Sequence, residues 1–96
     1  MGSVQLTPAA EDDLEDIWDH TCDQWDARQA DRYVDLLLAE CALLAEAPLT
    51  AAPCDHIRTG YRRRGAGRHV IYFRIVDGGI VIVRILHERM DQPSHL

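Results

Sequence analysis

The residues best suited to chemistry are arginines and histidines in the C-terminal half of the chain. A guanidinium group can bind phosphate or carboxylate groups, and an imidazole can take up and return a proton near neutral pH. The candidate proton carriers are His87 and His95, and the candidate cations are Arg58, Arg62, Arg68 and Arg84. A histidine such as His87 is more often a hydrogen-bonded structural residue than a catalyst, so these residue types permit the chemistry without establishing it.

Several of these residues belong to a predicted β-hairpin that is apolar on both faces. Two apolar runs, 68–76 and 80–87, flank a turn at Asp77-Gly78 or Gly78-Gly79. If the strands pair without interruption, odd positions of the first run share a face with even positions of the second. One predicted face carries Ile71, Phe73, Ile75, Ile80, Ile82 and Leu86, with His69 and Arg84 among them; the other carries Val70, Tyr72, Val81, Val83 and Ile85. An antiparallel sheet usually buries one face only. Because both faces are apolar here, we expect the second face to be covered by the chain's tail, a second copy or a partner.

The N-terminal half predicts a short strand and an amphipathic helix. Val4-Gln5-Leu6 fits the strand, and Thr7-Pro8 fits an N-cap followed by proline at the first helical position. Apolar residues at helical spacing place Trp18 and Trp25 in the core. The acidic run over residues 11–19 is most simply a solvated face, where the helix dipole favours negative charge.

A second helix and the remaining strands complete one domain. Asp26-Ala27-Arg28-Gln29 has the form of a capping box, and Pro48 ends the helix that it opens. The apolar stripe of this helix is Ala30, Tyr33, Val34, Leu37, Cys41, Leu44 and Ala45. Residues 56–58 and 61–62 predict an edge strand broken at Gly60, and residues 62–67 predict a basic turn. The predicted fold is α+β: a small antiparallel β-sheet packed against an N-terminal helical hairpin, in the order β-α-α-β-β-β over residues 1–96.

Charge divides the chain into two parts. Residues 1–55 hold two arginines against 13 acids, a formal charge of −11, whereas residues 56–96 hold eight arginines against three acids, a charge of +5. A partner segment matched to the basic part should be acidic with apolar anchors. The chain as a whole is acidic and has no lysine, which disfavours binding to ribosomal RNA.

Composition also excludes several classes of protein. Three separated cysteines fit reduced thiols, with Cys41 in the core, and fit neither a disulfide framework nor a zinc site. The histidines lack the close pairing of a metal site, and there is no glycine-rich phosphate loop, so no metal or cofactor is expected. No apolar run is long enough to span a membrane, so we expect a cytoplasmic protein with no membrane partner.

An ordered set of residues along nearly the whole chain resembles the ParE toxins of the RelE/ParE superfamily. The matching segments are 6–14 with Ile17, Trp25 with Gln29-Ala30 and Tyr33, Ile57-Arg58 with Tyr61, 68–73, and the ending Arg84-Ile85-Leu86-His87 with Arg89-Met90-Asp91. The resemblance implies a plasmid or chromosomal toxin that poisons DNA gyrase by protein contact, without turnover of its own. It also implies a ParD-type antitoxin in a hetero-oligomer, with operator DNA reached only through that antitoxin.

The resemblance implies no catalytic residue and a set of residues for binding the target or the antitoxin. These candidates are Arg58, Tyr61, Arg62, Arg68, His69, Tyr72, Arg84, His87, Arg89, Met90 and Asp91. The tail Arg89-Met90-Asp91 is expected to help engage the target, and Arg84 is expected to pair with Asp91 or with an acid of a helix. Two alternatives remain open: a RelE-type nuclease that cleaves messenger RNA on the ribosome, and a degenerate toxin that acts only in an antitoxin-bound repressor complex.

Overall fold

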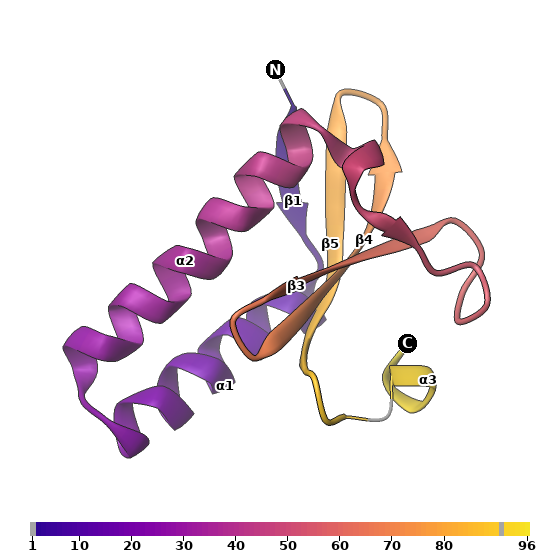
Figure 1. Cartoon of the computed structure of the whole chain (residues 1–96). Coiled ribbons are helices and arrows are strands. Elements are labelled where there is room, and N and C mark those ends of the chain that lie inside the picture. The colour runs from indigo at the N-terminus through magenta and orange to yellow at the C-terminus, as the bar shows by residue number, and fades with distance from the viewer. Residues whose placement is uncertain (1, 91) are drawn as a thin grey trace.

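The computed structural model describes residues 2–90 and 92–96, which form two long helices against one sheet (Figure 1). The helices are α1 (Pro8–Gln24), α2 (Ala27–Glu46), the 3-10 turn η1 (Pro48–Thr50) and the short α3 (Gln92–His95). The strands are β1 (Ser3–Leu6), β2 (Ala52–Pro53), β3 (Tyr61–Ala66), β4 (His69–Val76) and β5 (Gly79–His87). The predicted α+β fold and its order of elements are confirmed, with the two-residue β2 as an addition.

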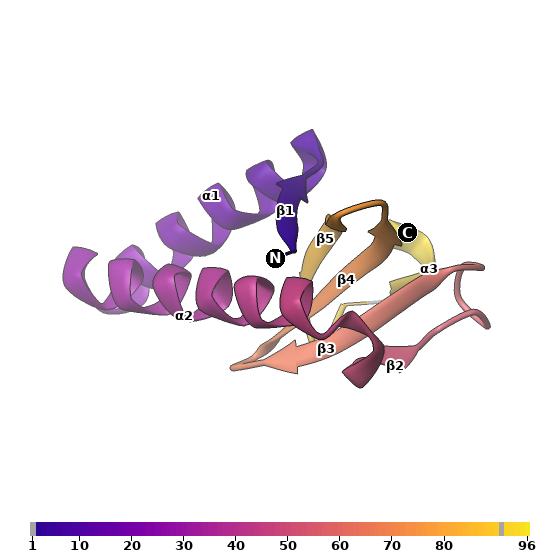
Figure 2. The ribbon, with the colours of Figure 1, turned by 90° about the horizontal axis from the view of Figure 1, so that it is seen from above.

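The described residues build a five-stranded sheet in the order β1-β5-β4-β3-β2. Neighbouring strands from β2 to β5 are antiparallel, whereas β1 runs parallel to β5 and sets Leu6 opposite Ile82. The sheet is therefore mixed, and the prediction of an antiparallel sheet is wrong for β1, because the helical hairpin separates β1 from the other strands and β1 pairs with the last one in the same direction. Figure 2 shows both long helices on one side of the sheet and the C-terminal end on the other.

Side-chain caps fix where the two long helices begin. The Thr7 hydroxyl accepts a hydrogen bond from the Ala10 N–H at 3.1 Å, with proline at the first position of α1. The Asp26 carboxylate accepts one from the Gln29 N–H at 2.8 Å at the start of α2. Both predicted caps are therefore confirmed.

The main core lies between the helical hairpin and the first face of the sheet. Its buried residues are Ala10, Ile17, Leu37, Cys41, Leu44, Ala45, Ala51, Ala66, Ile71, Phe73, Ile80, Ile82 and Ile85. Trp25 was predicted in this core, but it is 75% exposed because α1 ends at Gln24 and the chain turns there. Trp18 is half-buried, and its indole N–H donates to Asp31 at 2.9 Å.

A β-bulge at Val83 changes which residues of β5 face the helices. Near the Asp77-Gly78 turn, Phe73 lies opposite Ile82, as uninterrupted pairing predicts. Beyond the bulge Tyr72 lies opposite Arg84, because Val83 has no opposing residue in β4. The predicted faces are therefore correct near the turn and wrong beyond it. Ile85 and His87 lie on the helix-covered face, and Arg84 and Leu86 lie on the other.

The segment between α2 and β4 differs from its prediction. Residues 56–58, predicted as an edge strand, form a turn, and the edge strand is Ala52–Pro53. The predicted basic turn at 62–67 is mostly β3, whose Arg62 and Arg63 pair with β2. A run of arginines lacks the apolar residues from which a strand is usually predicted. In the structure these arginines nevertheless form a strand and point alternately to the two faces of the sheet.

A second, smaller core lies on the sheet face away from the long helices. Cys54, Tyr72 and Leu86 are fully buried there. Partly buried residues packed against them are Ile57, Tyr61, Val70 and Leu96. The chain's own loop and C-terminal end therefore cover part of the second apolar face.

Candidate partner-binding surface

The register of β3, β4 and β5 places arginines and tyrosines together on the second sheet face. One cross-strand row joins Arg63, Tyr72 and Arg84. The next row joins Tyr61, Arg74 and Val81. This arginine–tyrosine face, defined by these six residues, combines cations with aromatic and apolar surface.

The edge of this face is hollowed and incompletely paired. A hollow of about 400 Å³ is lined by Thr50, Ala52, Arg63, Arg64, Gly65 and Val70. β2 pairs only with Arg62 and Arg63, so β3 continues past its short neighbour. A strand edge of this kind can accept an extended peptide.

Tyr72 has a buried hydroxyl group that makes no hydrogen bond within the described residues. Burial raises the pKa of this phenol, and the nearby Arg63 guanidinium opposes the rise only in part. A buried hydroxyl without a partner costs free energy relative to a carbon–hydrogen group of similar shape. The second core therefore contains a buried polar group, the Tyr72 hydroxyl, whose hydrogen-bonding capacity is unused among the described residues.

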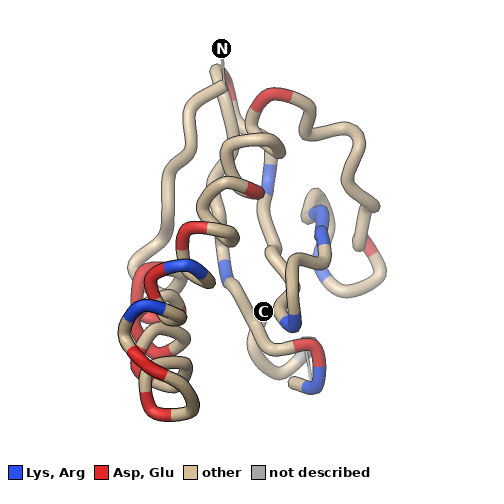
Figure 3. The backbone as a smooth tube through the Cα atoms, turned by 60° about the vertical axis from the view of Figure 1, so that its left-hand side comes forward, with Lys and Arg blue, Asp and Glu red and all other residues tan. Residues whose placement is uncertain are grey.

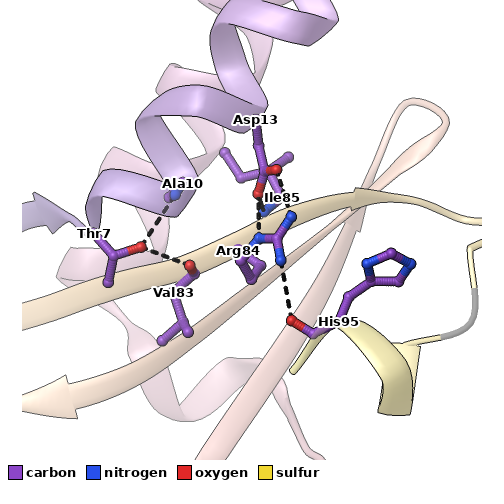
Figure 4. A network of polar contacts seen from close by, with 7 residues as sticks. All are labelled: Thr7, Ala10, Asp13, Val83, Arg84, Ile85 and His95. Carbon is purple, nitrogen blue, oxygen red and sulfur yellow. Dashed lines mark hydrogen bonds and ion pairs between the residues drawn. The ribbon is translucent and has the colours of Figure 1, made fainter.

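Arg84 is held by the first helix in a bidentate ion pair (Figure 4). Its Nε and Nη2 atoms donate to the two carboxylate oxygens of Asp13, each at 2.8 Å. The same carboxylate accepts the Ile85 N–H at 2.9 Å. Asp13 therefore departs from the predicted solvated acidic face, and the expected pairing of Arg84 with a helix acid is confirmed. This contact raises the pKa of Arg84.

The hydroxyl of Thr7 joins the same strand to the start of α1. It donates to the Val83 carbonyl at 2.7 Å while it caps the helix (Figure 4). The remaining Nη1 of Arg84 donates to the His95 carbonyl at 3.0 Å. Arg84 thus links α1, β5 and α3, and its guanidinium is engaged on both sides.

Two other candidates, His69 and His87, lie opposite each other on the helix-covered face. Their rings meet edge to face with centroids 5.3 Å apart. The Arg68 N–H donates to the Tyr33 hydroxyl at 2.9 Å, which leaves the phenol hydrogen for Nδ1 of His69 at 2.6 Å. Burial, and then the neighbouring His87, lower the pKa of His69 to about 4. This imidazole is therefore a neutral hydrogen-bond acceptor.

The remaining candidates are spread over the molecule. Arg62 donates to the Ala51 carbonyl at 2.8 Å, and Arg58 donates to the Leu96 carbonyl. Met90 is partly exposed and lines a hollow of about 430 Å³ with His87 and Arg89. Asp91 lies outside the described residues.

Sequence reasoning missed several residues that the structure makes important. Arg64 forms an ion pair with Glu40 of α2 at 3.0 Å and donates to Thr50. Asp13 was hidden among neighbouring acids of the same helix. The helical period could have singled it out, since it lies one position before Leu14 and four before Ile17, both of which pack toward the sheet.

Charge is separated in space as it is in sequence. Figure 3 shows aspartate and glutamate gathered mainly on the two long helices and arginine mainly on the strands and their connections. Within residues 2–90 and 92–96, no group of three or more His, Cys, Asp or Glu side chains is placed to hold a metal ion. None of the helices in those ranges is long and apolar enough to cross a membrane.

The fold is shared with a solved toxin–antitoxin structure. That structure is described as "Chromosomal ParDE TA system from P. aeruginosa" and superposes with a TM-score of 0.79 at 24% identity, covering 91% of this chain and 96% of the other. This likeness shows the fold, a class of small protein in which a helical hairpin packs on one face of a sheet.

Sequence comparison identifies the family. The model of the ParE toxin of type II toxin–antitoxin systems, parDE, matches residues 4–92. The chain is 42% identical over 92 residues to Toxin ParE1 of Mycobacterium tuberculosis strain H37Rv, covering 95% of this chain and 94% of that toxin. It is 36% identical over 96 residues to Toxin ParE1 of Caulobacter vibrioides, covering 100% and 99%. The chain therefore belongs to the ParE toxin family.

We expect Asp13→Ala to destabilise the fold by about 3 kcal/mol, because it leaves a largely buried guanidinium and the Ile85 N–H without their acceptor. The matched control is Asp12→Ala, which removes an exposed acid one residue away. Urea unfolding of both variants measures the difference. Equal midpoints for the two would show that the Asp13–Arg84 contact contributes nothing to stability.

We expect stability to fall as the pH drops from about 6.5 to about 4, because the unfolded His69 takes up a proton in this range and the folded one resists it. The stability is fully present above the unfolded pKa. After allowance for partial exposure, the loss is roughly 1–2 kcal/mol. His69→Gln keeps an acceptor for Tyr33, so its unfolding free energy should depend less on pH. An unchanged pH slope in this variant would contradict the assignment.

We expect Tyr72→Phe to leave the free energy of unfolding unchanged or to raise it by up to about 1 kcal/mol, since it removes a buried hydroxyl that has no described partner. Tyr33→Phe is the contrasting variant, because it removes a hydroxyl that makes two hydrogen bonds and should destabilise. Urea unfolding of both is the measurement. Destabilisation by Tyr72→Phe as large as that by Tyr33→Phe would mean that the Tyr72 hydroxyl has a partner.

Proposed function

We propose that this ParE-family toxin inhibits DNA gyrase by direct protein contact in the bacterial cytoplasm, and that a ParD-type antitoxin neutralises it in a hetero-oligomer. Membership of the ParE family supports the proposal, as do two relatives named Toxin ParE1. The similar fold described as a ParDE system supports an antitoxin partner. Operator DNA would be reached only through the antitoxin.

The arginine–tyrosine face is the observation that best supports an antitoxin partner. Arg63 and Arg74 offer positive charge beside apolar surface at Tyr61 and Val70, and the adjoining hollow lies at the incompletely paired edge of β3. An acidic, extended peptide with apolar side chains fits this combination by charge and by strand pairing. The ParD-type antitoxin is proposed as the source of that peptide.

The placement of one candidate nuclease pair, His87 and Arg84, does not favour RNA cleavage, whereas His95 lies next to Arg84. His87 falls on the helix-covered face beside His69, whereas Arg84 falls on the opposite face and is engaged by Asp13. A phosphodiester held by Arg84 would therefore not meet His87 on the same side of the sheet. Cleavage needs its proton carriers and cations around one phosphate, so a RelE-type reaction is poorly supported by this pair.

The proposal is tested by a gyrase supercoiling and cleavage assay with the purified chain, run with and without its antitoxin. We expect inhibition or trapped cleaved DNA that the antitoxin relieves. His87→Gln and His95→Gln should retain the effect, because no proton transfer by these residues is required. Loss of toxicity in either variant with antitoxin affinity preserved, or ribosome-dependent cleavage of messenger RNA, would contradict the proposal.

Tail variants locate the surface that contacts the target in the same assay. We expect a chain with Arg89→Ala and Met90→Ala to inhibit less while it still binds the antitoxin, since both side chains line an open hollow beyond β5. No effect of the wild-type chain on active gyrase would leave the degenerate-toxin alternative. No effect of the tail changes alone would move the target contact elsewhere.

A further inference from the structure

The second long helix carries two apolar stripes, and the main core uses only one of them. Leu37 and Leu44 are fully buried against the sheet. Leu36 and Leu43 precede them by one residue each, so their side chains are turned by about 100° around the helix axis. They are 49% and 63% exposed. Figures 1 and 2 show no other drawn element on the outer side of α2.

This outer stripe has the spacing of a helix–helix contact. Leu36 and Leu43 are seven residues apart, two turns of one helix face, and the small exposed Ala39 lies between them. The outer face of a surface helix is normally polar. Large leucines at this spacing therefore mark a seam that the described chain leaves without a partner.

We propose that the outer stripe of α2 binds a second copy of this chain, with the two α2 helices antiparallel across a two-fold axis near Ala39. In this register Leu36 of each copy faces Leu43 of the other, so one stripe serves both sides of the interface. Such self-complementarity is what a two-fold interface requires. The small side chain of Ala39 allows the helix backbones to approach at the axis.

The charges that flank the stripe match the same register. Arg32 precedes Leu36 by one turn, and Glu46 lies in the last turn of α2. Antiparallel packing brings Arg32 of one copy to the C-terminal turn of the other, where Glu46 and the negative end of the helix dipole lie. That turn has no basic residue of its own. Among the described residues, Arg32 takes part in neither of the two ion pairs, and Glu46 accepts only a long hydrogen bond, from the Gly2 N–H at 3.3 Å.

A second copy suits this face better than the acidic antitoxin segment proposed above. The helix lies in the acidic part of the chain, where residues 1–55 carry a formal charge of −11. A second copy carries the same acidic helices, but it also brings Arg32 to Glu46 at each end of the seam, and an acidic peptide has no such cation. One helix pair is a smaller interface than the standard size of about 800 Å² per partner, so the dimer is expected to be weak and concentration-dependent.

Sedimentation equilibrium of the full chain over a roughly hundred-fold range of concentration tests the proposal through mass action. We expect a reversible monomer–dimer equilibrium. The Leu36→Glu/Leu43→Glu variant should raise the dimer dissociation constant at least about tenfold, since it places four carboxylates in an apolar seam. The matched control is Ile75→Glu, which adds a carboxylate at an exposed position of β4 instead of α2.

Charge reversal tests the register itself. Arg32→Glu and Glu46→Arg should each weaken the dimer, and the double variant should restore it because the ion pairs are rebuilt with opposite sign. Arg74→Glu makes the same charge change at an exposed position of β4 and should leave the dimer unchanged. Ala39→Cys in a Cys22→Ser background should form a disulfide between copies on oxidation, whereas Ala9→Cys on α1 should not.

The result that overturns the proposal is a chain that stays monomeric over the whole concentration range. Failure of the double charge variant to recover, with both single variants weakened, would rule out this register. If the Leu36→Glu/Leu43→Glu variant loses antitoxin binding while the wild-type chain is a monomer, the stripe belongs to the antitoxin. Should that variant fail to fold, the cysteine and charge variants, which keep both leucines, still decide the question.

Discussion

The carboxylate of Asp13 holds the free edge of β5, and the arrangement of the rest of the molecule depends on it. β1 pairs with β5 over four residues, from Ser3 opposite Gly79 to Leu6 opposite Ile82. Beyond that point the edge would expose unpaired backbone groups, which are costly where a helix covers them. The Thr7 hydroxyl donates a hydrogen bond to the Val83 carbonyl, and the Asp13 carboxylate accepts one from the Ile85 N–H. Two side chains from the start of α1 and the residue before it therefore make hydrogen bonds to β5 that a neighbouring strand would otherwise make.

The same two side chains contact β5 at and next to the bulge at Val83. The bulge determines which residues of β5 face the helices and which face the other side of the sheet. Without it, Leu86 and Arg84 would lie beneath the helices, where an arginine would be buried among apolar side chains. With it, Ile85 enters the main core and Arg84 emerges at the edge within reach of Asp13. Hairpin patterning predicted both strands and the turn correctly. It could not predict the bulge, because the odd and the even positions of β5 are both mostly apolar. One extra residue therefore does not disturb the hydrophobic pattern of the strand.

Local signals in the sequence predicted the elements better than they predicted the site. Thr7-Pro8 and Asp26 with Gln29 are short-range caps, and the structure confirms both. Asp13, the bidentate partner of Arg84, lies 71 residues away in the sequence, and His69, the acceptor for the Tyr33 hydroxyl, lies 36 residues from Tyr33. Such contacts depend on how the hairpin and the sheet dock, which periodicity within one element does not encode. The arginines of β3 were taken for a turn for a related reason, since their strand is defined by its neighbours rather than by its own apolar content.

A chain of 96 residues has one helical hairpin to cover a sheet with two apolar faces, and this shortage explains where its open surfaces lie. The first face takes the hairpin. The second is covered only in part, by residues such as Ile57 and Leu96 around the buried Tyr72. The hairpin in turn has an outer side, and α2 carries leucines there as well as toward the sheet. Because the acidic helices and the basic strands differ in charge, the two open surfaces cannot favour the same segment of a partner. On the two proposals above, the arginine–tyrosine face would take an acidic peptide and the outer side of α2 a second copy, so one small fold would offer two different contacts.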